Sequence, residues 1–169
     1  MDWYAGKKEE AEKTKDASSE MHDDDTANRV ETLNNRIYFY SEVTRTKILT
    51  LNKKLTSLNI SLANQVNTLD LNYMHANIRL YINSFGGSVF AGFSAVDYIK
   101  KSKIPVETII DGCAASAATM MSIVAQRRYM NEHAFMLIHQ LSSTCWGTYE
   151  EMKDDMENND LLMKTIKQI

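Results

Sequence analysis

Two kinds of hydrophobic pattern alternate along the chain. Short runs rich in β-branched and aromatic residues lie at Arg36–Tyr40, Ile78–Asn83, Val106–Ile110 and Phe135–His139, and each predicts a β-strand. Between the first two runs, a long stretch without glycine or proline has an apolar residue at every third or fourth position, which predicts an amphipathic helix. Its apolar positions are Ile48, Leu51, Leu55, Leu58, Leu62, Val66 and Leu69. This face fits a helix that covers a sheet, and it also fits a coiled-coil partner helix.

Shorter helices are predicted at about 91–101 and from Ser116 to about Gln126, with a connection at 72–77. Strands that alternate with helices in this way predict an α/β fold, a mostly parallel sheet with right-handed βαβ crossovers. Sites in such sheets form beyond the carboxyl ends of the strands. Gly86–Gly87, Ser116 and His139 each lie at or just past such an end, so we expect them to come together.

The two ends of the chain differ from this central part. Residues 1–28 are charged and almost without large apolar side chains, which predicts a mobile tail or, alternatively, a docking segment that folds on a partner. Residues 29–169 are expected to form one domain. Its last segment, about 148–169, predicts a helix, because Thr148 and Glu151 have the spacing of a capping box. The apolar face of this helix has no later element to cover it, so we expect it to pack against another copy or against further residues. That face consists of Tyr149, Met152, Met156, Met163 and Ile166.

Composition narrows the class of protein. The 169 residues, 44% of them hydrophobic, suffice for one domain with a sizeable core. The net charge of −3 gives no reason to expect a nucleic acid or an anionic membrane as partner, and no apolar run reaches the roughly 20 residues that span a bilayer. The charged N-terminal segment does not resemble a secretory leader. Cys113 and Cys145 form no disulfide framework, so we expect a cytoplasmic protein.

Ser116 is the candidate nucleophile. It lies in the small-residue segment Gly112–Ala118, which we expect to turn between a strand and a helix. A serine hydroxyl needs a base to accept its proton as it attacks, and His139 at the next strand end suits that role. The negative oxygen that forms needs fixed donors. The N–H groups of Ala117, in the first helical turn, and of Gly87 are the expected oxyanion hole.

Each of these features also has a plainer interpretation. A serine at a helix start is usually an N-cap. Gly86–Gly87 fits an ordinary turn, because no Gly-Lys-Ser/Thr follows to make a phosphate loop, and His139 alone fits a core histidine. The remaining histidines and the cysteines lack metal-ligand spacing, so neither a metal nor another cofactor is expected. These residues are His22, His75, His133, Cys113 and Cys145.

Three motifs together resemble the proteolytic subunit of Clp protease, the ClpP family. They are Ile78–Val89 with Ala91–Gly92, Gly112–Ser116 and Met136–Gln140, in matching order and spacing. The resemblance covers residues from about 78 to 169 and extends back to about 36. It implies a ClpP/crotonase-like α/β fold with a projecting handle helix, and a serine endopeptidase that cleaves unfolded or tagged polypeptides.

By position, the resemblance implies that Ser116 is the nucleophile, His139 the base, and Gly87 with Ala117 the oxyanion hole. It further implies that an extended substrate polypeptide pairs as an added strand with the main chain of Gly86, Ser88 and Val89 on one side and of Gln140 and Leu141 on the other. The handle would join two stacked seven-membered rings of a homo-oligomer into a closed chamber. An AAA+ unfoldase is the partner that such a chamber implies.

The departures from the family pattern are specific. Phe85 stands where the family usually has proline before the glycine pair, and Leu141 replaces the proline after His-Gln. The stretch 142–147 replaces a glycine-rich segment, and the tail does not match the family's N-terminal loops. The third member of the triad, an aspartate, lies beyond the handle in the family, whereas this sequence ends at Ile169. We therefore expect a longer natural protein, since loss of the orienting carboxylate costs on the order of 10⁴ in turnover.

Acidic residues on the handle do not replace that aspartate: Asp154, Asp155 and Asp160 fit a solvated face better. Two alternatives to a chambered endopeptidase stay open, a peptidase of the same family that matures viral structural proteins and a truncated, inactive scaffold subunit. Acyl-CoA chemistry on the same fold is a weaker alternative, because enolate stabilisation does not need the serine and histidine pair and fold alone does not set function.

Overall fold

A computed structural model describes residues 29–169, and the predicted mobile tail at 1–28 lies outside the described residues. The described part is built on a six-stranded sheet in the order β1-β2-β3-β4-β5, with β6 also paired to β4. β1 and β2 form an antiparallel hairpin, and every other pairing is parallel. The strands are β1 (Arg29–Leu33), β2 (Arg36–Tyr40), β3 (Ile78–Ser84), β4 (Val106–Ala115), β5 (Arg127–Met130) and β6 (Phe135–Leu137).

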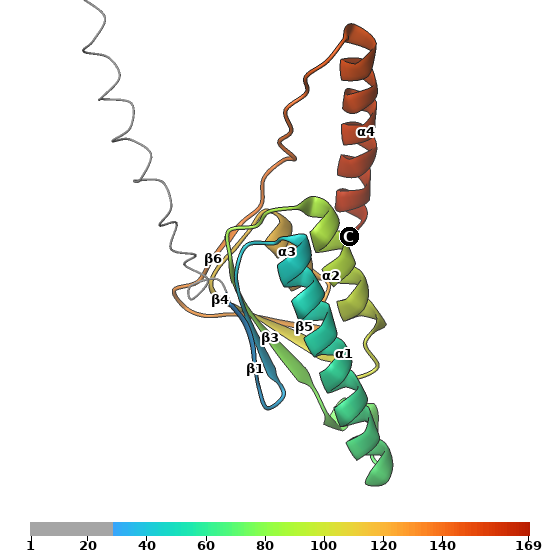
Figure 1. Cartoon of the computed structure of the whole chain (residues 1–169). Coiled ribbons are helices and arrows are strands. Elements are labelled where there is room, and N and C mark those ends of the chain that lie inside the picture. The colour runs from blue at the N-terminus through green and yellow to red at the C-terminus, as the bar shows by residue number, and fades with distance from the viewer. Residues whose placement is uncertain (1–28) are drawn as a thin grey trace, which may run out of the picture.

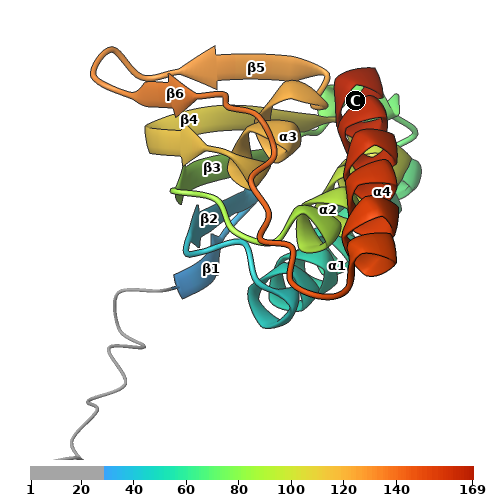
Figure 2. The same cartoon turned by 90° about the horizontal axis from the view of Figure 1, so that it is seen from above.

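Three helices cover one face of this sheet: α1 (Arg45–Thr68), α2 (Val89–Lys101) and α3 (Ala117–Ile123). A short 3₁₀ turn, η1 (Tyr73–His75), leads from α1 into β3. α1 packs beside α2, and α2 packs beside α3, which lies on β4 (Figure 2). The parallel β3 and β4 are joined through α2, so the expected α/β architecture is confirmed.

The core lies between the sheet and these helices. Residues of β3 alternate between buried and half-buried positions, as expected for a strand with one face on the core. From the sheet, Ile37, Phe39, Leu80 and Ile82 are completely buried. From α1, Ile48, Leu51, Leu55 and Val66 face the same core, whereas Leu69 caps the helix and is exposed. The amphipathic stretch therefore covers the sheet.

The opposite face of the sheet carries no helix within residues 29–169. The rings of Tyr38 and Tyr81 stack there, with centroids 4.9 Å apart. Glu107 is buried in the same layer and is paired with Arg79 at 3.4 Å and with Arg127 at 3.1 Å. Two arginines therefore compensate one buried carboxylate, which would be costly to bury alone.

The last helix, α4 (Tyr149–Gln168), stands away from this body at one end and returns to it at the other (Figure 1). Thr148 and Glu151 form the predicted capping box. Ile166 and Ile169 pack against the core, whereas Tyr149, Met152 and Met156 are exposed. The uncovered apolar face is thus shorter than expected, because the helix runs back to the body and its end is partly covered there.

Three further expectations about local structure are corrected. The segment Gly112–Ala115, expected to turn, is the end of β4, and it is held extended by pairing with β3 and β6. The helix after Ser116 ends at Ile123 instead of Gln126, and β6 ends at Leu137, two residues before His139. Among the described helices, none has the combination of length and apolarity needed to cross a membrane.

Candidate functional site

Ser116 occupies the single residue between β4 and α3, in a left-handed backbone conformation with φ 53° and ψ −126°. This conformation is uncommon for a residue other than glycine. The serine side chain makes no capping hydrogen bond to the helix, so the N-cap interpretation does not apply. The main chain is held instead: the Ser116 N–H donates to the Leu137 carbonyl at 2.9 Å, and the Thr119 N–H donates to the Ser116 carbonyl at 3.0 Å. Within residues 29–169, the hydroxyl therefore has no hydrogen-bond partner, while the backbone that carries it is fixed.

Gly86 and Gly87 follow β3 with φ angles of 101° and 141°, which residues with a side chain rarely adopt. A Cβ on Gly86 would lie 2.6 Å from the Cβ of Ser116 and 2.7 Å from the carbonyl oxygen of Ala115. A Cβ on Gly87 would lie 2.6 Å from the carbonyl oxygen of Val43. Glycine is therefore required at both positions, at the first so that the turn can approach Ser116 and at the second so that it can pair with Val43.

The glycine turn is fixed to Val43 by two backbone hydrogen bonds. The Val43 N–H donates to the Gly86 carbonyl at 2.7 Å, and the Ser88 N–H donates to the Val43 carbonyl at 2.8 Å. The residue between two such bonds directs its own N–H to the opposite side. Within residues 29–169, neither the Gly87 N–H nor the Ala117 N–H donates to another protein group. Both amides are available to an acceptor.

These groups meet in a pocket of about 140 Å³ at the carboxyl ends of β3, β4 and β6. Ser116, His139, Gly87 and Ala117 all line it, so the structure brings the predicted nucleophile, base and oxyanion donors together. The complete lining is Gly87, Val89, Ser116, Ala117, Thr119, Met120, Ile138, His139, Gln140, Leu141, Ser142 and Ile166.

His139 is exposed and lies past the end of β6. Its Nδ1 is 2.6 Å from the main-chain carbonyl oxygen of Gln140. In the described part of the chain, neither Ser116 nor any carboxylate is hydrogen-bonded to the ring. The imidazole and the serine thus line one pocket; one ring nitrogen is engaged, and the other has no hydrogen-bond partner within residues 29–169.

The predicted substrate-pairing residues divide into two groups. Val89, Gln140 and Leu141 line the pocket, whereas Gly86 and Ser88 do not. The Ser88 side chain accepts a hydrogen bond from the Ala91 N–H and caps α2, so Ser88 and Gly86 build the turn that supports the pocket.

Sequence reasoning missed several residues of the lining. Met120 enters through α3, Ile138 precedes the histidine, and Ile166 comes from the last turn of α4. The Leu141 N–H donates to the Met163 sulfur at 3.3 Å, which ties α4 to the segment after His139. No local signal in the sequence identifies Ile166, because its role depends on α4 returning to the body.

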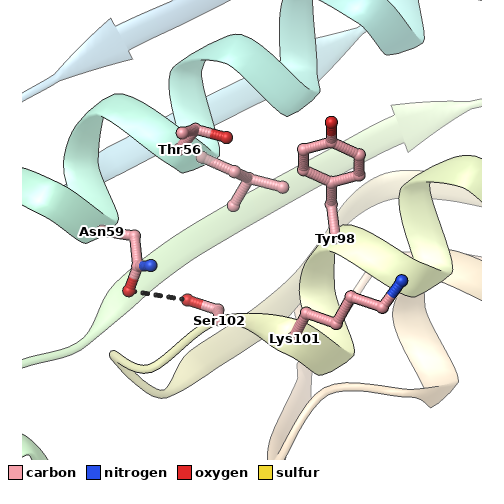
Figure 3. A pocket seen from close by; sticks show the side chains of 6 residues that line it. Thr56, Asn59, Tyr98, Lys101 and Ser102 are labelled. Atoms are coloured by element: carbon pink, nitrogen blue, oxygen red, sulfur yellow. Dashed lines mark hydrogen bonds between the residues drawn. The ribbon is translucent and has the colours of Figure 1, made fainter.

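A second hollow of about 310 Å³ lies between α1 and α2 (Figure 3). The Asn59 side-chain oxygen accepts hydrogen bonds there from the Ser102 hydroxyl at 3.3 Å and the Ile104 N–H at 2.9 Å, so its polar groups are used to join the two helices. Tyr98 and Lys101 complete its rim. The Lys101 ammonium is paired with Asp97 at 3.7 Å, and the Ser102 hydroxyl also contacts the Ile104 carbonyl at 2.7 Å. Within residues 29–169, no group of histidine, cysteine and carboxylate side chains is placed to hold a metal ion.

The fold and the pocket define an α/β protein in which a pocket lined by a serine, a histidine and several apolar side chains opens at the carboxyl ends of parallel strands. The sequence matches the family model described as Clp protease over residues 28–169. The chain therefore belongs to the Clp protease family.

Individual relatives agree with this assignment. An ATP-dependent Clp protease proteolytic subunit 1 from Chlamydia muridarum is 38% identical over 109 residues, which are 63% of this chain and 51% of that protein. A proteolytic subunit from Streptococcus mutans is 35% identical over 134 residues, 77% of this chain and 67% of that protein. The chain spans about half the length of the chlamydial relatives that it matches. Among solved structures, a ClpP1 mutant from Listeria monocytogenes has a TM-score of 0.65 at 23% identity, covering 80% of this chain and 69% of its own, and it shows the same fold.

Proposed function

We propose that this chain carries the active site of a Clp-type serine endopeptidase that cleaves unfolded polypeptides inside an oligomeric chamber. The observation that carries the proposal is the geometry at Ser116: an uncapped hydroxyl on a left-handed residue, with two unused N–H groups and a histidine lining the same pocket. Membership of the Clp protease family supports it.

In the proposed mechanism, His139 accepts the Ser116 proton while the serine oxygen attacks the scissile carbonyl. The negative oxygen that forms accepts hydrogen bonds from the Gly87 and Ala117 N–H groups. Ala117 begins α3, although the N–H groups of Gly87 and Ala117 themselves, rather than the dipole of so short a helix, provide the main stabilisation. His139 then donates the proton to the leaving amine, and water hydrolyses the acyl-enzyme by the same steps.

The substrate would bind as an extended strand along the segment that contains Gln140 and Leu141, so that recognition depends on its main chain. An apolar side chain next to the scissile bond would occupy the pocket between Val89, Met120 and Ile166. A pocket of this size and lining favours aliphatic or methionine side chains over charged ones.

The proposed chamber would form by contact between copies of α4. The exposed face of α4 consists of Tyr149, Met152 and Met156, and Trp146 before the helix is 95% exposed. An apolar face of this kind on a projecting helix fits contact with the same face of another copy. Relatives in the family are named ATP-dependent, so an AAA+ unfoldase is the partner proposed to deliver substrate.

The test is hydrolysis of an unfolded, fluorescently quenched casein and of short peptides by the full-length protein. Turnover is expected in the parent, with loss of at least about 10³-fold in Ser116→Ala and in His139→Ala. Equal turnover in Ser116→Ala and the parent would contradict the proposal.

A second candidate function is an inactive scaffold subunit. It is favoured by one observation, that the described Ser116 and His139 share a pocket without a hydrogen bond between them. A protein that assembles normally but neither hydrolyses peptide nor reacts at Ser116 would support the scaffold instead.

A further inference from the structure

The hydrogen bond between the His139 ring and the main chain beside it has a consequence for catalysis. The Nδ1 atom lies 2.6 Å from the Gln140 carbonyl oxygen. A carbonyl oxygen can only accept a hydrogen bond, whereas a neutral imidazole nitrogen is either a donor or an acceptor. The contact is therefore favourable only when Nδ1 carries the proton.

We propose that the main-chain carbonyl of Gln140 is a positioning group that fixes neutral His139 in the Nδ1–H tautomer. In that tautomer Nε2 carries a lone pair, and it is the nitrogen that can accept the Ser116 proton. The inference rests on the proposed function for its catalytic meaning, although the tautomer itself is a property of the ring and its neighbour.

The proton balance of the step is simple. The Ser116 O–H bond breaks, an N–H bond forms at Nε2, and the serine oxygen forms a bond to the substrate carbonyl carbon, whose π electrons move to its oxygen. His139 becomes an imidazolium that still donates from Nδ1 to Gln140. In a serine protease triad a carboxylate orients the histidine, and the wrong tautomer costs on the order of 10⁴ in kcat. Here the neutral carbonyl of Gln140 shares that orienting role.

A neutral carbonyl should orient the ring without stabilising its positive charge as a carboxylate does, because hydrogen bonds between charged partners are roughly twice as strong as neutral ones. The carbonyl therefore sets which nitrogen is the base, whereas stabilisation of the imidazolium charge would need a carboxylate at the ring, and none is hydrogen-bonded to it within residues 29–169.

The tautomer can be measured without any turnover. Two-bond ¹H–¹⁵N correlation spectra of the ¹⁵N-labelled 169-residue chain, recorded where the rings are neutral, distinguish a protonated Nδ1 from a protonated Nε2, and His139→Gln assigns the signals. His133 makes no hydrogen bond within residues 29–169 and is the internal reference. His75 should behave like His139, because its Nδ1 lies 3.1 Å from the Asn72 carbonyl oxygen.

The ratio of Nδ1–H to Nε2–H is expected to be about fivefold higher or more for His139 than for His133, the ratio that a typical net hydrogen bond gives. Equal ratios for the two rings would overturn the proposal.

A backbone variant tests the carbonyl itself. Replacing Leu141 by its α-hydroxy analogue converts the peptide bond after Gln140 into an ester, whose carbonyl is a weaker acceptor. We expect the His139 ratio to fall severalfold. This variant also removes the Leu141 N–H that donates to Met163, so Met163→Leu, which removes the sulfur acceptor and keeps the peptide bond, is the matched control and should keep the parent ratio.

An ester variant with an unchanged ratio, or a Met163→Leu variant with the same fall, would overturn the positioning role. These outcomes are separate from the proposed function: a chain with the Nδ1–H tautomer but an unreactive Ser116 would contradict the peptidase and leave the tautomer inference standing.

Discussion

The backbone of Ser116 is the most constrained feature of the site. A non-glycine residue in such a conformation costs on the order of 1–3 kcal/mol and persists only when its surroundings hold it there. Here the holding groups are the Leu137 carbonyl, the Thr119 N–H and the close contact with Gly86. The strained backbone conformation therefore directs the Ser116 hydroxyl to the pocket instead of to the helix terminus.

Gly86→Ala should damage the site strongly. The new Cβ would meet the Ser116 Cβ at 2.6 Å and the Ala115 carbonyl oxygen at 2.7 Å, so Ser116 has to move. We expect a fall in peptide turnover of about 10²-fold, the effect of displacing a reacting group by roughly 1 Å, measured as kcat/KM on a short peptide.

Gly112→Ala is the matched control for this prediction. Gly112 has a similar φ of 106°, but its Cβ would meet the side chain of Asn83 at 2.8 Å, which can rotate. Both variants should lose stability through backbone strain, measured by thermal unfolding, and only Gly86→Ala should lose turnover beyond its loss of folded protein. Equal losses of turnover would contradict the role given to Gly86.

At this scale, much of the candidate site is predictable from the sequence. Ser116 and His139 stand out because they follow apolar runs, and parallel strands bring their carboxyl ends to one edge. The contact of Gly86 with Ser116 and the wall formed by Ile166 are not predictable, because each depends on the approach of segments that are far apart in the sequence.

At the scale of the elements, β2 and β4 contribute Tyr40 and Asp111 to a polar cluster on the face of the sheet that carries no helix within residues 29–169. The Tyr40 hydroxyl donates to one oxygen of Asp111, and the Asn131 amide donates to the other at 2.6 Å. Burial of the phenol, followed by its hydrogen bond and charge interaction with Asp111, raises the pKa of Tyr40 to about 12 from 10.

Asp111→Asn should lower the pKa of Tyr40 toward, but not to, 10, because the burial effect remains. A phenol with a raised pKa in the folded state contributes stability below pH 10, and this contribution is lost as the pH rises through 12. Tyrosinate absorbance during alkaline titration, with Tyr40→Phe to assign the signal, measures the shift. A Tyr40 titration that is the same in Asp111→Asn and in the parent would contradict the network.

The last turn of α4 forms a wall of the pocket, so it should influence substrate preference. Ile166→Ala enlarges the space beside Ser116 and is expected to raise kcat/KM for a large side chain over a small one by about tenfold or more, the usual worth of one or two methylene groups in a pocket. Leu161→Ala, on the same helix but 64% exposed, is the control and should leave the preference unchanged. A preference that does not move in Ile166→Ala would exclude α4 from the substrate pocket.

The long elements with a buried apolar face are the ones that the sequence predicts. α1, α2, β2 and β3 follow directly from their periodicity. β1 and β5 are not predicted, because their residues are almost all exposed and their pairing with a neighbouring strand, not burial, defines them. The end of β4 was expected to turn because glycine and alanine disfavour strands, and its pairing on both sides overrides that preference.

At the scale of the whole molecule, the exposed apolar face of α4 is not covered by any described part of the same chain. Met156→Glu places a charge in the centre of this face and should prevent contact between handles, so that the assembled mass of the full-length protein falls to about half if two rings meet there. Sedimentation velocity measures this change.

Asn158→Glu adds the same charge about half a turn around the helix, on its polar side, and should leave the assembly intact. Equal sedimentation of the Met156→Glu and Asn158→Glu proteins would contradict the proposed handle contact.

The central claim is that Ser116 is an activated nucleophile. The most direct measurement is labelling of the assembled full-length protein with a fluorophosphonate probe, followed by mass spectrometry of the modified peptide. We predict one stoichiometric adduct on Ser116, absent in Ser116→Ala and formed much more slowly in His139→Ala. An intact, assembled protein that remains unmodified at Ser116, or that is labelled equally at other serines, would contradict the account.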